Sequence, residues 1–365
     1  MRNPLPPGFR DRLPPEAEAL AVLLRTVVDV AAAHGYQRVQ PPLVEHEAEL
    51  SVSLGGCGGH LLRAADPLTG AALALRPDIT AQVARIAATR LASAPRPLRL
   101  AYGGPVVRGR GTQLEPAREL VQAGAELVGS DGEAALREIL SVAIEALTSA
   151  GVESLSVDLT LPDLVAELAR TTWPVADVES VARALDAKDA GALLSLGAAD
   201  YAILLEAAGP ADSALARLDA AGPALAPALA RLRPLVDALR GVRVTIDPTE
   251  RHGFEYQSLG FSLFGTVAGQ PLRGEIGRGG AYRVRHPARS PEPACGFSLY
   301  LDPLIDAGLG QAISRRVFVG AGASPEAAAR LRADGWVTVA ALSDQAPPAG
   351  CTHILDGDTP RPLGA

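Results

Sequence analysis

Lysine is nearly absent from this 365-residue chain, and its few cysteines stand far apart. Lys188 is the single lysine, so almost all positive charge is carried by arginine. The sequence therefore argues against Schiff-base chemistry and against phosphate-binding loops that depend on a lysine. Cys57, Cys295 and Cys351 are odd in number and widely spaced, with no Cys-x-x-Cys pair. The sequence indicates neither a disulfide framework nor a structural zinc site.

Long apolar runs are missing as well. No stretch of 18 uninterrupted apolar residues occurs, and the first residues carry no apolar signal core. A hydrophobic content of 48% with 21% charged residues is ordinary for a packed chain of two or three domains. The formal net charge of −7 argues against a surface that wraps nucleic acid, and a local basic patch is the alternative. We expect a reduced, cytoplasmic protein that binds neither membrane nor nucleic acid.

Two apolar segments joined by a basic loop stand at the centre of the sequence. The run from Leu98 to Val107 predicts a strand that ends at Arg108, and a second strand is expected to end near Gly129. Such a pair can hold a nucleotide or a small zwitterion on the sheet face, because arginine offers a planar fork of donors and Gln or Glu accepts from an ammonium. The alternative is a hairpin whose polar residues merely face solvent.

This stretch resembles motif 2 of the class II aminoacyl-tRNA synthetases, in the version found in histidyl-tRNA synthetases. That family has Phe-Arg-x-Glu at the end of the first strand and Arg-Glu-Phe-x-Gln-x-Gly-x-Glu-x-x-Gly on the second. The residues that fall in step are Arg118, Glu119, Gln122, Gly124, Glu126 and Gly129. The resemblance implies that Gln122 and Glu126 contact the amino group of a substrate amino acid.

The half of motif 2 that binds ATP departs from the family pattern. Arg108 is kept, but Arg110 stands where the family has an acid, and Glu115 and Pro116 replace the usual Gly-Arg pair of the loop. The resemblance therefore implies that the contacts to histidine survive while the contacts to ATP are eroded.

The segments before motif 2 extend the resemblance. A helix is expected over about residues 15–34, and the proline-bearing strand YQRVQPPLVE resembles motif 1, the dimer-interface element of class II synthetases. LALRPDIT, residues 73–80, predicts a strand followed by a helix that runs to about Arg90, with Thr80 as its cap. The family has Arg-Pro-Glu-x-Thr here, so the resemblance implies that Asp78 binds the substrate ammonium. A helix cap is the alternative role for this carboxylate.

Two further segments resemble the histidine-specific parts of the family. Residues 242–264 match an Arg-Gly-Leu-Asp-Tyr-Tyr signature at Glu255 and Tyr256, although His252 stands where an arginine contacts the substrate carboxylate, with Arg251 beside it. EIGRGGAYRV, residues 275–284, matches a Gly-Gly-Arg-Tyr segment and keeps Tyr282, although such a glycine pair is often only a turn. The histidine site that the resemblance implies comprises Asp78, Thr80, Arg108, Gln122, Glu126, Glu255, Tyr256 and Tyr282.

Motif 3 departs most from the family. ACGFSLYLDPLI, residues 294–305, aligns with Gly-Phe-x-x-Gly-x-Glu-Arg-Leu. Tyr300 stands where a glycine makes room for the nucleotide, and Pro303 where an arginine holds the γ-phosphate. Proline supplies neither charge nor donor. We expect ATP-dependent activation of an amino acid to be lost, and the sequence implies no cofactor and no metal.

The expected fold is α+β: a class II synthetase-like antiparallel sheet flanked by helices. We predict a first core segment over residues 1–160, a helical insertion over 161–240, a second core segment over 241–310 and a short C-terminal β/α segment over 311–365. About 60 residues follow residue 305. The family's anticodon-binding domain needs roughly 100, so we expect it to be missing or reduced to a stub.

This combination resembles the synthetase paralogues that serve as regulatory subunits of ATP phosphoribosyltransferase. The resemblance implies a catalytically inactive homodimer, formed through motif 1, that partners the short-form catalytic subunit. The pair would carry out the first step of histidine biosynthesis and respond to histidine as feedback inhibitor. The alternatives are an active histidyl-tRNA synthetase, a synthetase-like ligase that loads another acceptor, and a scaffold that binds no amino acid.

Overall fold

The computed structural model describes residues 5–53, 61–112, 115–250, 256–286, 289–311, 315–343 and 346–363. The chain divides into two compact units, Met1–Gly310 and Gln311–Ala365. Within the described residues, no helix combines the length and the apolar character needed to cross a membrane.

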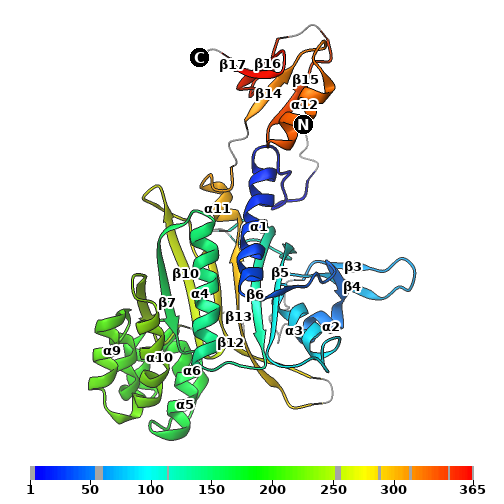
Figure 1. The fold of residues 1–365 in the computed structure, drawn as a ribbon. Coiled ribbons are helices and arrows are strands. Elements are labelled where there is room, and N and C mark those ends of the chain that lie inside the picture. The colour runs from blue at the N-terminus through cyan, green and yellow to red at the C-terminus, as the bar shows by residue number, and fades with distance from the viewer. Residues whose placement is uncertain are drawn as a thin grey trace. The chain divides into compact units, whose positions relative to one another are not determined.

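A ten-stranded mixed sheet forms the centre of the first unit (Figure 1). The strand order is β1-β5-β6-β13-β12-β10-β7-β9-β8, and β11 pairs with β10. The strands from β5 to β7 in this order are antiparallel, whereas β1 is parallel to β5 and β9 is parallel to β7. The bounds are β1 (Gln37–Arg38), β5 (Leu98–Val107), β6 (Glu119–Val128), β7 (Glu153–Thr160), β8 (Gly209–Pro210), β9 (Arg243–Asp247), β10 (Gln257–Val267), β11 (Gln270–Pro271), β12 (Gly277–Val284) and β13 (Glu292–Tyr300).

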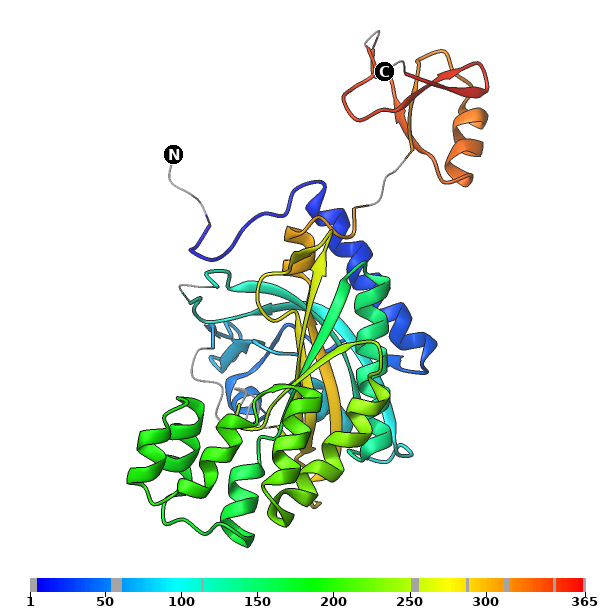
Figure 2. The same cartoon turned by 90° about the vertical axis from the view of Figure 1, so that its left-hand side faces the viewer.

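Two long helices, α1 (Glu16–Ala33) and α4 (Glu133–Ser149), cover one face of this sheet (Figures 1 and 2). Both have apolar residues at helical spacing, and Leu23 of α1 and Ile139 of α4 are buried against the sheet. Helix α3 (Thr80–Ala88) packs on the opposite face through Val83 and Ala87. Residues alternate between the faces of a strand, so β6 sends Ala123 and its odd-numbered neighbours toward α1 and α4, and its even-numbered residues toward the face that carries α3.

The predicted proline-bearing strand is divided by its prolines. Residues before them form β1, and residues after them form β2 (Val44–His46), which pairs with β4 (Ala72–Leu75) in a small sheet of order β2-β4-β3 that includes β3 (Arg63–Ala65). Arg76 is 4% exposed and donates from Nε to the carbonyl of Pro105 (2.8 Å) and from a terminal nitrogen to the carbonyl of Pro41 (2.9 Å). Helix α2 (Glu47–Ser53) follows β2.

The chain between β7 and β9 forms a helical insertion that gathers at one end of the sheet (Figures 1 and 2). Lys188, at a positive φ of 55° between two of its helices, donates from Nζ to Asp247 at the end of β9 (2.6 Å) and to the hydroxyl of Thr249 just after it (2.7 Å). The only lysine thus ties the insertion to the core. The helices are α5 (Leu164–Thr171), α6 (Val178–Asp186), α7 (Ala190–Ser195), α8 (Ala202–Glu206), α9 (Ala211–Ala220) and α10 (Ala226–Ala238).

The second unit is a small β/α structure. Its sheet has the order β15-β14-β16-β17, in which β15 and β16 are parallel to β14. The Ser324 hydroxyl accepts a hydrogen bond from the Ala327 amide (3.2 Å) and so caps the single helix among the described residues of this unit. The elements are β14 (Arg316–Val319), α12 (Pro325–Ala333), β15 (Val337–Ala340), β16 (His353–Asp356) and β17 (Thr359–Pro362).

Candidate functional site

The candidate site lies on the face of the sheet that carries α3. The even-numbered residues of β6 form rows with β5 on one side and β13 on the other. Because cross-strand neighbours on one face are about 4.5–5.5 Å apart, each row brings side chains from distant parts of the sequence together. The three rows are Gly104–Gln122–Tyr300, Tyr102–Gly124–Ser298 and Leu100–Glu126–Gly296.

Glu126 occupies one end of the site. It is 1% exposed; its Oε1 accepts a hydrogen bond from the Tyr102 hydroxyl (3.0 Å) and its Oε2 from the Tyr282 hydroxyl (2.9 Å). Burial raises the pKa of this carboxyl to about 8, against the opposing effect of hydroxyl donors from Tyr282, Thr80 and Tyr102. Near pH 7 Glu126 is therefore held largely as the neutral acid.

Gln122 and Asp78 occupy the other end. Gln122 is fully buried, and its amide is fixed: Oε1 accepts from the Ile79 amide (2.8 Å), and Nε2 donates to Asp78 Oδ2 (2.7 Å) and to Ser298 Oγ (2.7 Å). The other oxygen of Asp78 accepts from the Thr80 amide (2.7 Å). Asp78 therefore both orders the start of α3 and belongs to the site.

The expectation that Thr80 caps α3 is wrong. The helix begins at Thr80 itself, and the cap position is Ile79, which has no side-chain acceptor. The Thr80 hydroxyl instead lies 3.0 Å from the Tyr102 hydroxyl. Thr80 thus joins the site through its side chain, while Asp78 binds the backbone at the start of the helix.

Ser298 and Tyr102 connect the two ends. The Tyr102 hydroxyl lies 2.8 Å from Ser298 Oγ, so a continuous run of hydrogen bonds leads from Asp78 to Tyr282. Sequence reasoning missed both residues, although Ser298 stands two positions from Tyr300 and therefore shares its face. We refer to the following residues as the sheet-face network: Asp78, Thr80, Tyr102, Gln122, Glu126, Tyr282 and Ser298.

Arg108 does not contact Glu126. It donates to Glu115 (2.7 Å), and its guanidinium carbon lies 5.9 Å from the centre of the Tyr300 ring. A second arginine, Arg278 of β12, lies 5.8 Å from the same ring and donates from Nε to Glu275 (2.5 Å). Sequence reasoning did not single out Arg278. Tyr300 is thus flanked by two cations, next to the Gln122 end of the network.

Tyr256 and Glu255 are the remaining predicted site residues. Tyr256 is half-buried, and a Cβ on Gly280 would approach its ring to 2.9 Å, so the tyrosine lies over β12 beside the network. Burial raises the pKa of Tyr256 well above its ordinary value. Glu255, together with Arg251 and His252, lies outside the described residues.

Asp302, at the start of α11 (Asp302–Asp306), has a structural role. Its Oδ2 accepts from the Val121 amide (2.9 Å) and its Oδ1 from Arg12 (2.5 Å), so the carboxylate joins motif 3 to β6 and to the segment before α1. Pro303 stands in the first turn of the helix, where its missing N–H costs nothing.

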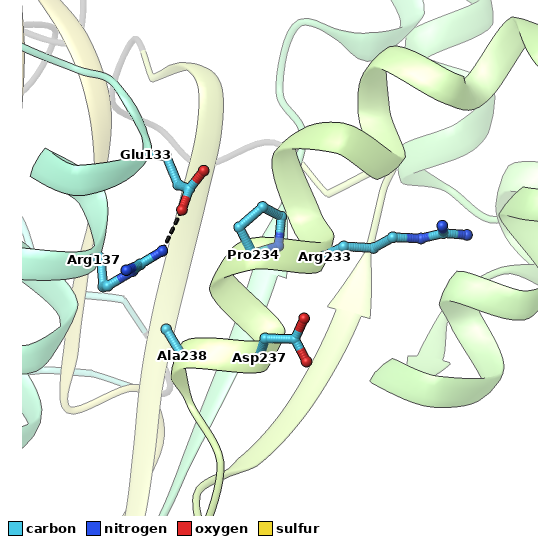
Figure 3. Close-up of a pocket in the computed structure, with 6 residues that line it drawn as sticks. All are labelled: Glu133, Arg137, Arg233, Pro234, Asp237 and Ala238. Atoms are coloured by element: carbon cyan, nitrogen blue, oxygen red, sulfur yellow. Dashed lines mark hydrogen bonds and ion pairs between the residues drawn. The ribbon is translucent and has the colours of Figure 1, made fainter.

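A surface pocket of about 600 Å³ lies elsewhere, between α4 and α10 (Figure 3). Glu133 and Arg137 pair with each other on α4, while Arg233 extends away from them and binds Asp219 (2.8 Å). None of the predicted site residues lines this pocket, and α4 covers the other face of the sheet. Its charged side chains are already paired, Glu133 with Arg137 and Arg233 with Asp219, so we do not take this pocket as the candidate site.

A sheet of this order, with the network on the face opposite α1 and α4, defines a protein of the class II aminoacyl-tRNA synthetase type. The histidyl-tRNA synthetase family model matches residues 8–304. Two relatives, each named ATP phosphoribosyltransferase regulatory subunit, are 42% identical to this chain. The one from Paramagnetospirillum magneticum matches over 97% of this chain and 96% of its own length. The one from Rhodospirillum rubrum matches over 98% and 96%.

A solved structure agrees with the family. It is described as an ATP phosphoribosyltransferase regulatory subunit/histidyl-tRNA synthetase from Bacillus halodurans, with a TM-score of 0.74 and 26% identity over 93% of this chain and 94% of that one. The chain belongs to the histidyl-tRNA synthetase family and, within it, to the ATP phosphoribosyltransferase regulatory subunits. The predicted fold class and family are confirmed.

Proposed function

We propose that this chain binds histidine on the sheet-face network and transmits its presence to a short-form ATP phosphoribosyltransferase catalytic subunit, without synthetase activity of its own. One observation carries the proposal: the network from Asp78 to Tyr282 is complete, while Tyr300 and Pro303 stand where a synthetase contacts ATP. The names of the 42% identical relatives support the pairing with a catalytic subunit.

The two ends of the network suit the two ends of histidine. The Asp78 carboxylate is half-buried beside Gln122 and can accept from an α-ammonium. Glu126 lies beyond Ser298 and Tyr102, with both oxygens on tyrosine hydroxyls. We therefore assign Glu126 to the imidazole rather than to the ammonium with which its sequence motif grouped it. A ring with one donor and one acceptor nitrogen can exchange hydrogen bonds with a neutral acid and a tyrosine hydroxyl.

Regulation requires that histidine bind one state of the assembled complex more tightly than another. The network joins β5, β6, β12 and β13 to the start of α3, so an occupied site holds four strands and a helix together. The complex would catalyse the first step of histidine biosynthesis, and histidine would be its feedback inhibitor.

Calorimetry on the subunit and kinetics on the reconstituted complex test this function. Glu126→Ala should weaken histidine binding about tenfold or more, because it removes a buried hydrogen bond to the imidazole ring. It should make the phosphoribosyltransferase less sensitive to histidine while leaving assembly intact. Glu119→Ala is the matched control, since Glu119 is an exposed residue of the same strand. A wild-type subunit that gives no heat with millimolar histidine would show that the network is no effector site.

We also propose that the chain forms a homodimer through the segment from Pro41 to Glu45. Leu43 and Val44 are exposed to 38% and 37% in this segment, and the prolines before them are fixed by Arg76 and Gln82. An exposed apolar segment on a rigid support favours self-association. Leu43→Asp should yield monomers in sedimentation experiments, whereas Leu194→Asp, at an exposed site of the insertion, should not. A monomeric wild-type chain at micromolar concentration would contradict the proposal.

A further inference from the structure

Among the described strands, arginine side chains approach the sheet-face network only at the end that contains Gln122. Tyr300 is the cross-strand neighbour of Gln122, and Arg278 is the cross-strand neighbour of Ser298. The guanidinium carbons of Arg278 and Arg108 lie 5.8 and 5.9 Å from the Tyr300 ring centre. The row through Glu126 continues instead across Leu100, Gly296 and Gly280, which carry no charge.

This asymmetry fixes the direction in which an amino acid can bind. The ammonium and the carboxylate of an α-amino acid are attached to the same carbon, so their sites must be adjacent. If the ammonium binds Asp78, the carboxylate lies at the Gln122 end, where the two arginines stand. At the Glu126 end a carboxylate would meet a buried acid and two tyrosines, and no residue that the structure describes there supplies a cation to offset the cost of its desolvation.

Arg278 is held in place but keeps donors for a ligand. Its bond to Glu275 uses Nε, and Glu275 also accepts from the Ser262 hydroxyl (3.1 Å), which anchors the pair on the sheet. Within the described residues, its two terminal amino groups make no hydrogen bond, so they can bind a planar, bidentate acceptor such as a carboxylate. Arg108, in contrast, is paired with a glutamate whose side chain is 60% exposed, and such a surface pair is weak and easily exchanged.

We propose that Arg278, with Arg108, forms the subsite for the α-carboxylate of the bound amino acid. The ligand class is therefore free α-amino acids, and analogues with an alcohol, ester or amide in place of the carboxylate are rejected. This inference rests on the proposed binding of histidine to the network and adds a specificity-determining residue to it. Tyr300 then contributes to the subsite, because its ring lies between the two arginines and holds them apart beside Gln122.

The test compares histidine with histidinol, which carries an alcohol in place of the carboxylate. Titration calorimetry on the full chain should show that the wild type prefers histidine at least tenfold. Arg278→Met should lower the affinity for histidine about tenfold or more and leave that for histidinol within about twofold, so that the preference collapses. Arg278→Lys should keep part of the preference for histidine that Arg278→Met loses. Lysine retains a positive charge for the carboxylate but lacks the planar, bidentate donors of the guanidinium.

Arg283→Met is the matched control. Arg283 belongs to the same strand but lies on its opposite face, near Asp131 at 3.8 Å, so it should leave both affinities unchanged. Thermal unfolding of each variant identifies loss of fold. If the wild type binds histidine and Arg278→Met keeps the full preference over histidinol, this inference is wrong and the proposed function stands. If the wild type binds neither compound, the proposed function itself fails.

Discussion

A Cβ atom on Gly296 would lie 1.7 Å from Oε2 of Glu126. The two residues are cross-strand neighbours on β13 and β6, so the missing side chain of one provides the space that the carboxylate of the other occupies. Gly124 has the same role in the neighbouring row, where an added Cβ would lie 2.6 Å from the Tyr102 hydroxyl. The network thus depends on small residues that make no hydrogen bond to it through a side chain.

Gly296→Ala should therefore destabilise the chain and displace Glu126 from Tyr282. Overpacking of a buried site costs about 1–3 kcal/mol, measurable as a lower free energy of unfolding in urea, and histidine binding should weaken with it. The control is Gly191→Ala in α7, where the nearest heavy atom to an added Cβ is 3.4 Å away. Equal stability of the two variants would show that Glu126 does not lie across Gly296.

The free energy of unfolding should carry a pH dependence that originates from Glu126. Burial raises the pKa of this carboxyl from 4.5 to about 8 in the folded chain. Between these values the folded state holds a proton that the unfolded state has released. The raised pKa of Glu126 therefore contributes fully to the free energy of unfolding below about pH 4.5. This contribution is lost as pH rises toward 8, by at most about 1.4 kcal/mol per pH unit.

Glu126→Gln should remove that dependence. The measurement is chemical denaturation of both chains from about pH 4.5 to about pH 8.5, a range that spans both pKa values, with Glu119→Gln as the control for an exposed acid on the same strand. The stability difference, wild type minus Glu126→Gln, should fall as pH rises. A difference that stays constant across the range would mean that Glu126 is ionised in the folded chain.

Histidine-dependent pyrophosphate exchange should be absent. By its resemblance to motif 3, Tyr300 stands where the family has a glycine that makes room for the nucleotide, and Pro303 offers no donor to a phosphate. The assay measures labelled pyrophosphate incorporated into ATP at saturating histidine, with an active histidyl-tRNA synthetase as the positive control. Exchange clearly above a reaction without protein would restore the synthetase as the function.

Arg76→Met should destabilise the first unit by about 2–4 kcal/mol, because it leaves the carbonyls of Pro41 and Pro105 buried without a donor. Thermal and urea unfolding measure the loss. Self-association should weaken as well, since Arg76 supports the segment from Pro41 to Glu45. Arg63→Met, at an exposed arginine of β3 that pairs with Glu47, is the control and should change stability by less than about 1 kcal/mol.

Local patterns predicted the elements of the core well. The strand expected from Leu98 to Val107 is β5 with the same bounds, because an apolar run broken by small residues can be buried on both faces of a sheet. The helix expected over about residues 15–34 is α1, from Glu16 to Ala33. The predicted division of the first unit around a helical insertion, by contrast, stays a prediction.

The site was predicted incompletely, because its contacts depend on register between distant strands. Tyr102, Gly124 and Ser298 meet in a single row although Tyr102 and Ser298 are 196 positions apart. A motif assigns Glu126 to a ligand, but it does not show that Glu126 and Asp78 lie on opposite sides of Ser298. Arg278 escaped notice because a single arginine in a glycine-rich strand has no local signal; its importance arises from Tyr300 beside it.

Because the chain has a single lysine, the insertion can be labelled chemically at one known side chain. An acylating reagent that modifies side-chain amines has one target, Lys188, and its ammonium is engaged by Asp247 and Thr249. The rate of that modification, followed by mass spectrometry, therefore reports how often the Lys188 ammonium leaves Asp247 and Thr249 at the end of β9. Adding histidine or the catalytic subunit to the reaction would show directly whether either one slows that release.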